Sequence, residues 1–266
     1  MNAPDGIHAE TAGAGPPLVL VHAGICDSGM WDPQWRTLAG RHRLIRHDMR
    51  GFGRSPVPPG AYSHARDLLA VMDAAGVAEA VVVGASMGGR VALEVAVARP
   101  ERVSALVLVG SGLPGHEWSD AVKEYWAAED EAIERGDLAA AAEVNVRFWI
   151  DGPGRRPEDV DPELRRHAHA MQLRALELQV PSYLEVGDLE EPLVPDLGDR
   201  LGAVTQATLV VVGEADQPDI HSIARRIAAS LPDTTEASIP DAGHLPSMER
   251  PEAFDGILAA FLSGRA

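Results

Sequence analysis

Short runs of consecutive apolar residues alternate along the chain with stretches whose apolar positions recur every three or four residues. The runs are typical of buried strands and lie at 18–21, 43–48, 80–83, 103–109, 207–212 and 235–239. Helical spacing is clearest at 62–75, 219–231 and 251–262. Strands that are apolar at successive positions have both faces covered, so the pattern predicts an α/β fold: a mostly parallel central sheet flanked by helices.

This alternation stops between about residues 113 and 195, where no strand pattern occurs and charged residues are frequent. Spacing there predicts helices near 120–135, 138–150 and 163–178. The segment holds six of the twelve aromatic residues: Trp118, Tyr125, Trp126, Phe148, Trp149 and Tyr183. We interpret 113–195 as a helical cap inserted into a core made of 1–112 and 196–266. The alternative is that these aromatic residues only pack the segment's own small core.

Acidic residues outnumber basic ones across the 266 residues, since 40 Asp and Glu against 23 Lys and Arg give a formal net charge of −17. Such a chain repels the phosphates of nucleic acids and anionic lipid headgroups, so we expect neither nucleic acid nor a membrane surface as a partner. The expected partner is a small-molecule substrate, and a homodimer is compatible with the sequence.

Three features predict a cytoplasmic protein. No apolar run approaches the ~18 residues of a membrane-spanning helix. The start of the chain, MNAPDGIHAE, lacks the basic and apolar regions of a secretory signal. The single cysteine, Cys26, cannot form an internal disulfide, which fits a reducing compartment.

The pentapeptide Gly84-Ala85-Ser86-Met87-Gly88 is a candidate nucleophile site. It follows a valine-rich strand and precedes a helix, the context in which a G-x-S-x-G sequence forms a sharp turn that exposes the serine. Glycines are expected there because side chains would collide with the neighbouring strand and helix. The helix N-terminus then points at the Ser86 hydroxyl and favours developing negative charge. The alternative is a plain glycine-rich turn with an incidental serine.

A serine hydroxyl is a weak nucleophile and needs a general base that is oriented by a third group. Of the ten histidines, His244 fits best, because its Gly- and Pro-containing loop lies between the last predicted strand and the last helix. Asp216 is the candidate third group, since it stands just past the preceding strand. Asp219 and Glu214 are its rivals for that role.

Four other histidines and the single cysteine are candidate metal ligands or catalytic groups, but they predict no metal site. His22 and His47 also end strands, and we interpret them as hydrogen-bonded scaffold residues. His167 and His169 are two positions apart, so on a helix they do not face each other, and zinc needs further ligands. Cys26 is expected to be a small buried apolar side chain.

The order Ser86, Asp216, His244 on an alternating α/β chain resembles the α/β-hydrolase fold family. Three further segments match family patterns in register, namely LVLVHAG at 18–24, DMRGFGRS at 48–55 and DAGH at 241–244. The resemblance extends over nearly the whole chain apart from the predicted cap. It implies a serine hydrolase in which side chains and backbone supply every part, with neither a metal nor an organic cofactor.

The resemblance also implies where an oxyanion hole would form. In the family, the backbone N–H of the residue after the nucleophile, here Met87, is one donor, and the loop after the first long strand supplies the other. That loop carries His-Gly in the family but reads His22-Ala23-Gly24 here. The second donor is therefore the N–H of either Gly24 or Ile25.

The stretch 21–31 looks more like the branch containing 3-oxoadipate enol-lactonases and small carboxylesterases than like lipases. Those enol-lactones are anionic, whereas the predicted cap has 8 basic and 19 acidic residues and a net charge of −11. We therefore expect a small to medium, largely apolar and uncharged substrate portion. The residues expected to line its pocket, besides Met87, are Ile25, Trp31, Trp118, Trp126 and Trp149.

These residues together predict a serine hydrolase that cleaves an ester or a lactone through an acyl-enzyme. The same triad serves carbon–carbon bond hydrolysis, hydroxynitrile cleavage and perhydrolysis, which fold and triad do not separate. A slow-turnover ligand-binding or signal receptor that keeps the triad is an alternative of another class. A thioesterase acting on a carrier-bound acyl chain is disfavoured by the acidic cap.

Overall fold

The protein is built around one β-sheet. Its computed structural model describes residues 6–264. The first five residues of the stretch considered for a secretory signal lie outside that range. The strands are β1 (Ala9–Ala12), β2 (Pro17–Val21), β3 (Arg43–His47), β4 (Ala80–Ala85), β5 (Val103–Val109), β6 (Thr208–Gly213) and β7 (Thr234–Ile239). Their order is β1-β3-β2-β4-β5-β6-β7, and all neighbours are parallel except β1 and β3. The predicted α/β fold is confirmed.

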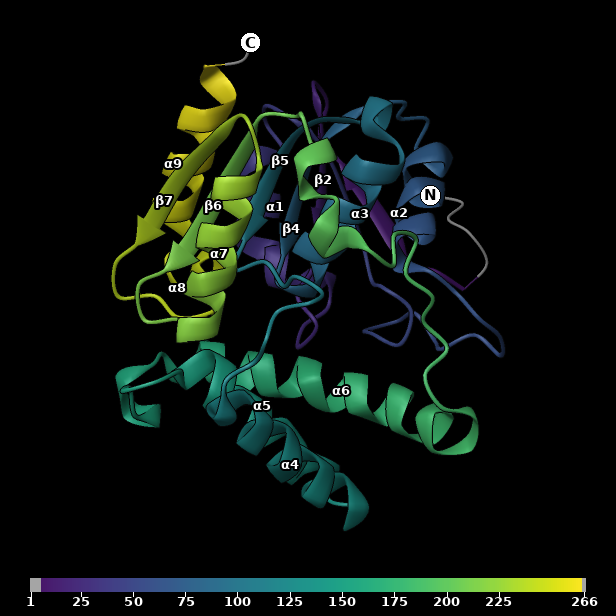
Figure 1. Ribbon diagram of the computed structural model, residues 1–266, viewed down its shortest axis with the longest axis vertical. Coiled ribbons are helices and arrows are strands. Elements are labelled where there is room, and N and C mark those ends of the chain that lie inside the picture. Colours follow the sequence, from purple (N-terminus) through teal and green to yellow (C-terminus); the bar gives the residue numbers. More distant parts are fainter. Residues whose placement is uncertain (1–5, 265–266) are drawn as a thin grey trace.

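Helices cover both faces of this sheet (Figure 1). Val19 of β2 packs in the same apolar cluster as Leu68, whereas its neighbours Leu18 and Leu20 pack with Leu258 on the opposite face. This alternation explains why the strands are apolar at successive positions. The helices of the first face are α2 (His64–Ala74), α3 (Met87–Ala98) and α7 (Pro218–Ser230), and those of the second are α1 (Asp32–Leu38) and α9 (Pro251–Ser263), with the short α8 (Pro246–Glu249) next to α9.

The sequence pattern does not predict β1 or α1. β1 has the sequence AETA, which contains no apolar run, and it forms because the edge of β3 offers it backbone partners. Its Glu10 also accepts a hydrogen bond from Arg46 of β3, with 2.9 Å between Oε2 and Nε. α1 is a seven-residue helix that follows a 3-10 turn (Ser28–Trp31), too short for a clear helical period.

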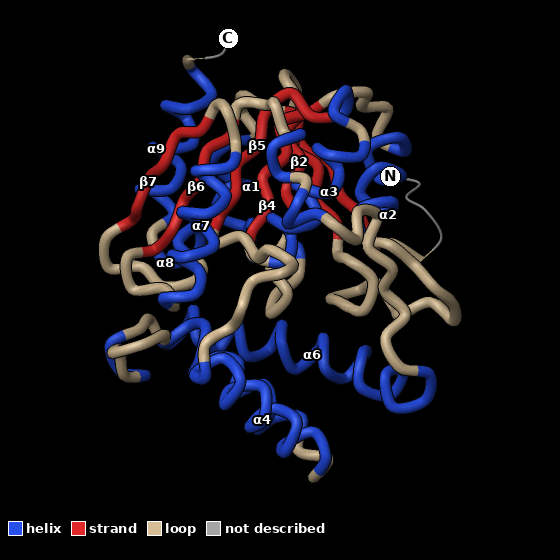
Figure 2. The backbone as a smooth tube through the Cα atoms, in the orientation of Figure 1, coloured by secondary structure: helices blue, strands red, loops and turns tan. Residues whose placement is uncertain are grey.

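The segment between β5 and β6 is helical. It contains α4 (Asp120–Glu134), α5 (Leu138–Asn145), a π-helical turn (Val146–Asp151) and α6 (Pro162–Val186). Figures 1 and 2 show these helices lying together beyond the end of the sheet toward which the strands run. α6 continues past the predicted end at 178 and includes the exposed Pro181, which lacks the N–H of a helical hydrogen bond. No helix within residues 6–264 combines the length and apolar character needed to cross a membrane.

Candidate active site

Ser86 occupies a strained turn between the end of β4 and the start of α3. Its backbone has φ 51° and ψ −114°, a region that residues other than glycine rarely adopt and that costs roughly 1–3 kcal/mol. A backbone hydrogen bond ties the turn to the neighbouring strand, since the Ser86 N–H donates to the carbonyl of Val109 on β5 over 2.8 Å. The side chain is half-buried at the carboxyl end of the strand, ahead of the helix N-terminus.

The glycines of the motif are required by close packing around this turn. A Cβ at Gly84 would collide with the carbonyl oxygen of Gly88, and a Cβ at Gly88 would collide with that of Val21 on β2. A Cβ at Gly89 would collide with the Ser111 side chain. The backbone of α3 therefore approaches β4, β2 and the chain after β5 more closely than any side chain would allow.

The structure brings Ser86, His244 and Asp216 together in one chain of hydrogen bonds. His244 Nε2 lies 2.9 Å from Ser86 Oγ, and His244 Nδ1 lies 2.9 Å and 3.1 Å from the two carboxylate oxygens of Asp216. His244 is 2% exposed and Asp216 is 4% exposed. Gly110 (φ +53°) passes beside the pair, where a Cβ would lie only 3.3 Å from both side chains. The loops after β4, β6 and β7 thus meet at one edge of the sheet.

The two rival carboxylates lie elsewhere. Asp219 accepts hydrogen bonds from the Ser119 hydroxyl over 2.6 Å and the Ser119 N–H over 2.9 Å, and it contacts His116 at 3.1 Å. Glu214 accepts from the exposed Ser238 hydroxyl over 3.1 Å. Neither contacts His244, so Asp216 alone among the three candidates orients it.

The histidines at the ends of β2 and β3 differ in their contacts. His22 Nδ1 donates to the carbonyl of Ala23 over 2.8 Å, and Nε2 accepts from the N–H of Met49 over 2.9 Å, as expected of a scaffold residue. His47, in contrast, has no hydrogen-bond partner at either ring nitrogen among residues 6–264, so its expected hydrogen bonding is wrong. Burial and the neighbouring His22 lower the pKa of His47 to about 3, and the ring is therefore neutral.

Three backbone N–H groups lie where an oxyanion hole is expected. Met87 is the first residue of α3, so its N–H has no acceptor within the helix. Gly24 lies against it, since a Cβ at Gly24 would be 3.5 Å from Met87 Cβ. In the part of the chain that the structure describes, the N–H groups of Met87, Gly24 and Ile25 all lack a protein acceptor. Hydrogen bonding within the described chain therefore does not distinguish Gly24 from Ile25 as the expected second donor.

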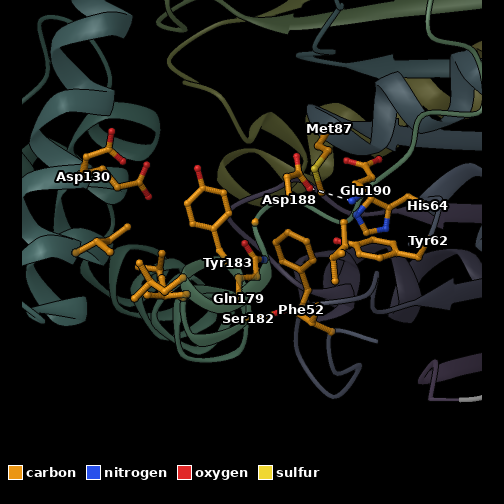
Figure 3. A pocket seen from close by; sticks show the side chains of 18 of the residues that line it. Phe52, Tyr62, His64, Met87, Asp130, Gln179, Ser182, Tyr183, Asp188 and Glu190 are labelled. Carbon is orange, nitrogen blue, oxygen red and sulfur yellow. Dashed lines mark hydrogen bonds between the residues drawn. The ribbon is translucent and has the colours of Figure 1, made fainter. Parts of the chain in front are cut away.

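A cavity of about 550 Å³ begins at Met87, the residue next to Ser86, and lies between the sheet edge and the helical segment (Figure 3). Phe52 and Tyr62 line it from the loops before α2. Gln179 and Tyr183 line it from α6. Met87 is thus the residue that connects the Ser86 turn to this space, which is large enough for a small molecule.

Comparison with known proteins places this geometry in a family. A sequence model of the alpha/beta hydrolase fold matches residues 16–251. The chain belongs to the α/β-hydrolase fold family. It is 29% identical to a protein described as putative carbamate hydrolase RutD from Caulobacter segnis, over 98% of this chain and 97% of that protein.

Two solved structures of esterolytic or lactone-degrading enzymes are also similar. A thermophilic esterase from Thermogutta terrifontis has a TM-score of 0.80 and 29% identity, covering 97% of this chain and 93% of its own. Est816, described as an N-acyl homoserine lactone degrading enzyme, has a TM-score of 0.77 and 27% identity, covering 97% and 98%. The protein is thus a hydrolase of the α/β fold, as its sequence predicts.

Of the six side chains expected in the pocket of this hydrolase, Met87 lines the cavity and the other five do not. Trp31 is 0% exposed and packs against Phe254 with ring centroids 6.2 Å apart, so its expected pocket role is wrong: it is a core residue. Ile25 is also buried in the core. Trp118 and Trp126 pack on each other, with centroids 5.8 Å apart, rather than facing the cavity.

Trp149 is the exception among the tryptophans, because it reaches the candidate catalytic residues. Its ring lies over His244, with centroids 4.4 Å apart and an interplanar angle of 35°. Trp149 stands on the π-helical turn Val146–Asp151, a rare geometry that occurs often at functional sites. It covers the imidazole of His244 and does not line the cavity.

Apart from Met87, the residues that line the cavity, such as Phe52, Tyr62, His64 and Gln179, are not predicted by the sequence pattern. Phe52 belongs to the 48–55 motif, which was the one local signal that could have indicated it. The others carry no motif. They meet only because α6 and the chain after it fold back over the loops that precede α2.

Proposed function

We propose that this hydrolase cleaves ester or lactone bonds of small to medium, largely apolar substrates through an acyl-enzyme on Ser86. The observation that carries the proposal is the continuous chain of hydrogen bonds from Ser86 through His244 to Asp216. It supplies a nucleophile, a general base and the group that fixes the tautomer of that base. The neighbouring cavity begins one residue from the nucleophile.

In this mechanism His244 Nε2 removes the proton of the Ser86 hydroxyl as its oxygen attacks the substrate carbonyl carbon. The buried Asp216 carboxylate stabilises the imidazolium that forms. The backbone N–H groups of Met87 and Gly24 donate to the carbonyl oxygen as it becomes negative, and each such donor is typically worth about 3–4 kcal/mol. His244 then returns the proton to the leaving alcohol, and a water molecule activated by the same imidazole releases the acid.

Similar proteins support this substrate class, since one is described as an esterase and another as degrading a lactone. The similarity to a putative carbamate hydrolase, 29% identical over 98% of the chain, favours carbamate cleavage as a second candidate. Both candidates use the same attack on a carbonyl carbon; they differ in the atom bonded to that carbon, which is carbon in an ester or lactone and nitrogen in a carbamate, so the covalent intermediate is an acyl-enzyme or a carbamoyl-enzyme. A substrate panel therefore contains p-nitrophenyl esters, lactones and carbamates.

The test is covalent labelling combined with turnover. A fluorophosphonate is expected to label Ser86, found by mass spectrometry of the digested protein, and Ser86→Ala is expected to lose labelling and ester turnover together. The matched control is Ser238→Ala, which changes an exposed serine remote from the cavity and is expected to leave both unchanged. Ester turnover retained by folded Ser86→Ala would remove Ser86 from the mechanism.

A further inference from the structure

The cavity beside Ser86 is lined by one sign of charge. Five of its 19 lining residues are Asp or Glu, and none is Lys or Arg; the five are Glu129, Asp130, Glu134, Asp188 and Glu190. In Figure 3, Asp130 on α4 lies on one side of the cavity, and Asp188 and Glu190 after α6 lie on the other. A substrate in this space is therefore flanked by carboxylates from two directions.

Most of this charge is not neutralised by the protein. In the described part of the chain, no Lys or Arg forms an ion pair with Asp130, Glu134 or Asp188. Glu190 pairs with Arg90 over 2.6 Å, but Arg90 is shared with the buried Glu94 over 2.8 Å. Carboxylates that face one cavity without counter-charges favour a cation there.

The remaining walls are suited to an organic cation rather than to a metal ion. The rings of Phe52, Tyr62 and Tyr183 line the cavity, and aromatic faces attract quaternary and protonated amines. Apolar side chains such as Leu176 and Leu184 also line it. The negative surroundings act on Tyr62, whose pKa is raised to about 12 by burial and by the carboxylates of Glu190 and Asp188.

The one histidine in the wall does not oppose a cation. His64 is 2% exposed, and burial together with the positive charge of Arg90 lowers its pKa well below the usual value, so the ring is neutral. Its Nδ1 has no hydrogen-bond partner in the described chain. His64 lies beside Tyr62, with ring centroids 5.1 Å apart (Figure 3). The imidazole is therefore an uncharged part of the cavity wall, and its buried Nδ1 is unpaired in the described chain.

We propose that the hydrolase selects esters that carry an ammonium group next to an apolar portion, and that Asp130, Glu134, Asp188 and the aromatic wall recognise that cation. This inference rests on the proposed function, because it assigns a substrate class to the same site. It changes the expectation of an uncharged substrate, which was drawn from the net charge of the segment without the position of its carboxylates.

The experiment compares esters that differ only in charge. Butyrylcholine and 3,3-dimethylbutyl butyrate place a quaternary nitrogen or a quaternary carbon in the alcohol portion. Phenyl 4-(trimethylammonio)butanoate and phenyl 5,5-dimethylhexanoate do the same in the acyl portion. In at least one pair, kcat/KM is expected to be about tenfold higher for the cation, and this preference is expected to shrink as ionic strength rises.

Variants of the cavity carboxylates test whether these residues cause the preference for the cationic ester. The triple variant Asp130→Asn, Glu134→Gln, Asp188→Asn is expected to reduce the ratio of the two kcat/KM values by about twofold per carboxylate, because kcat/KM falls more for the cationic ester than for the neutral one.

A matched control removes three other exposed acidic residues from the same elements. Glu124→Gln, Glu185→Gln and Glu191→Gln lie on α4, on α6 and in the chain after α6, and none lines the cavity. This control has the same change in net charge and is expected to keep the preference. A control that loses the preference equally would overturn the assigned site.

The failure of the inference differs from the failure of the proposed function. Neutral esters cleaved by a route that needs Ser86, with no preference for the cation in either pair, would overturn the inference alone. Absence of Ser86-dependent turnover with every ester would overturn both. Binding without turnover is a second measurement. In ligand-observed NMR, Ser86→Ala is expected to bind choline more tightly than 3,3-dimethylbutan-1-ol. Equal binding of the two alcohols would contradict the inference.

Discussion

At the scale of single residues, the contact between His244 and Asp216 controls which ring nitrogen of His244, the proposed general base, carries the proton. A carboxylate can only accept hydrogen bonds, so it keeps the proton of the neutral imidazole on Nδ1. Nε2 is then free to accept from Ser86, 2.9 Å away. Because Asp216 is 4% exposed, water cannot replace it in this role.

The change Asp216→Asn is expected to reduce kcat/KM by roughly 10⁴-fold, since the amide can donate to Nδ1 and so favours the wrong tautomer. Ester turnover and thermal unfolding of the purified variant measure activity and folding separately. Asp219→Asn is the matched control, because Asp219 bonds to Ser119 and not to His244. A larger loss in the control than in Asp216→Asn would show that the orienting acid is misassigned.

At the scale of elements, the turn between β4 and α3 sets the position of the nucleophile. Ser86 keeps a positive φ because the packing of three backbone segments around Gly84 and Gly88 leaves no other path for the chain. The backbone strain of this turn is confined to Ser86, and the packing of the sheet against α3 compensates for its free-energy cost. Side-chain volume is therefore excluded at Gly84 and Gly88.

Two glycine substitutions are expected to have opposite effects on the free energy of unfolding, measured by urea titration. Gly84→Ala is expected to lower it by about 3 kcal/mol or more, because the new methyl group meets the backbone of Gly88. Gly256→Ala, in the exposed middle of α9 with nothing near its Cβ, is expected to raise it by about 0.5–1 kcal/mol. A stable Gly84→Ala would contradict the account of the turn.

The π-helical turn is a second element that acts on the site. Buried Asp151 at its end accepts hydrogen bonds from Arg165 over 2.6 Å and 2.9 Å. The Arg155 side chain also donates to the Asp151 carbonyl over 2.7 Å. These contacts hold the turn in place, and with it the ring of Trp149 over His244.

At the scale of the whole molecule, buried neutral histidines make folding sensitive to pH. His47 is fully buried without a hydrogen bond, and its pKa of about 3 in the folded state lies below the ~6.5 of an unfolded chain. Below pH ~6.5 the unfolded state binds the proton and the folded state does not. Stability is therefore lost as pH falls from about 6.5 toward 3.

His47→Leu is expected to remove about 2 kcal/mol of the decrease in unfolding free energy between pH 7.5 and pH 5, since the replacement does not titrate and breaks no hydrogen bond. Urea unfolding at the two pH values measures the difference. His167→Gln, which alters an exposed histidine, is the control and is expected to retain the wild-type pH dependence. A wild-type pH dependence in His47→Leu would show that the pKa of His47 is the same in the folded and unfolded states, which would contradict this account.

The sequence by itself determined the α/β fold, six of the strands and the three residues that the structure joins. Each of Ser86, Asp216 and His244 sits in a short motif directly after a strand, and parallel strands end at one edge of the sheet. Local pattern and this geometric rule were sufficient. They did not indicate β1, whose pairing depends on the edge of β3 and not on its own residues.

Only the tertiary structure decided the substrate cavity and its charge. Trp31 and Trp149 are equally plausible pocket residues in the sequence. In the structure Trp31 packs against Phe254 in the core, whereas the ring of Trp149 lies over His244. The carboxylates of Asp130 and Asp188 are 58 positions apart and share a cavity only because α4 and α6 fold over the sheet edge. A pattern records which face of its own element a residue occupies; the packing between elements determines what that face meets.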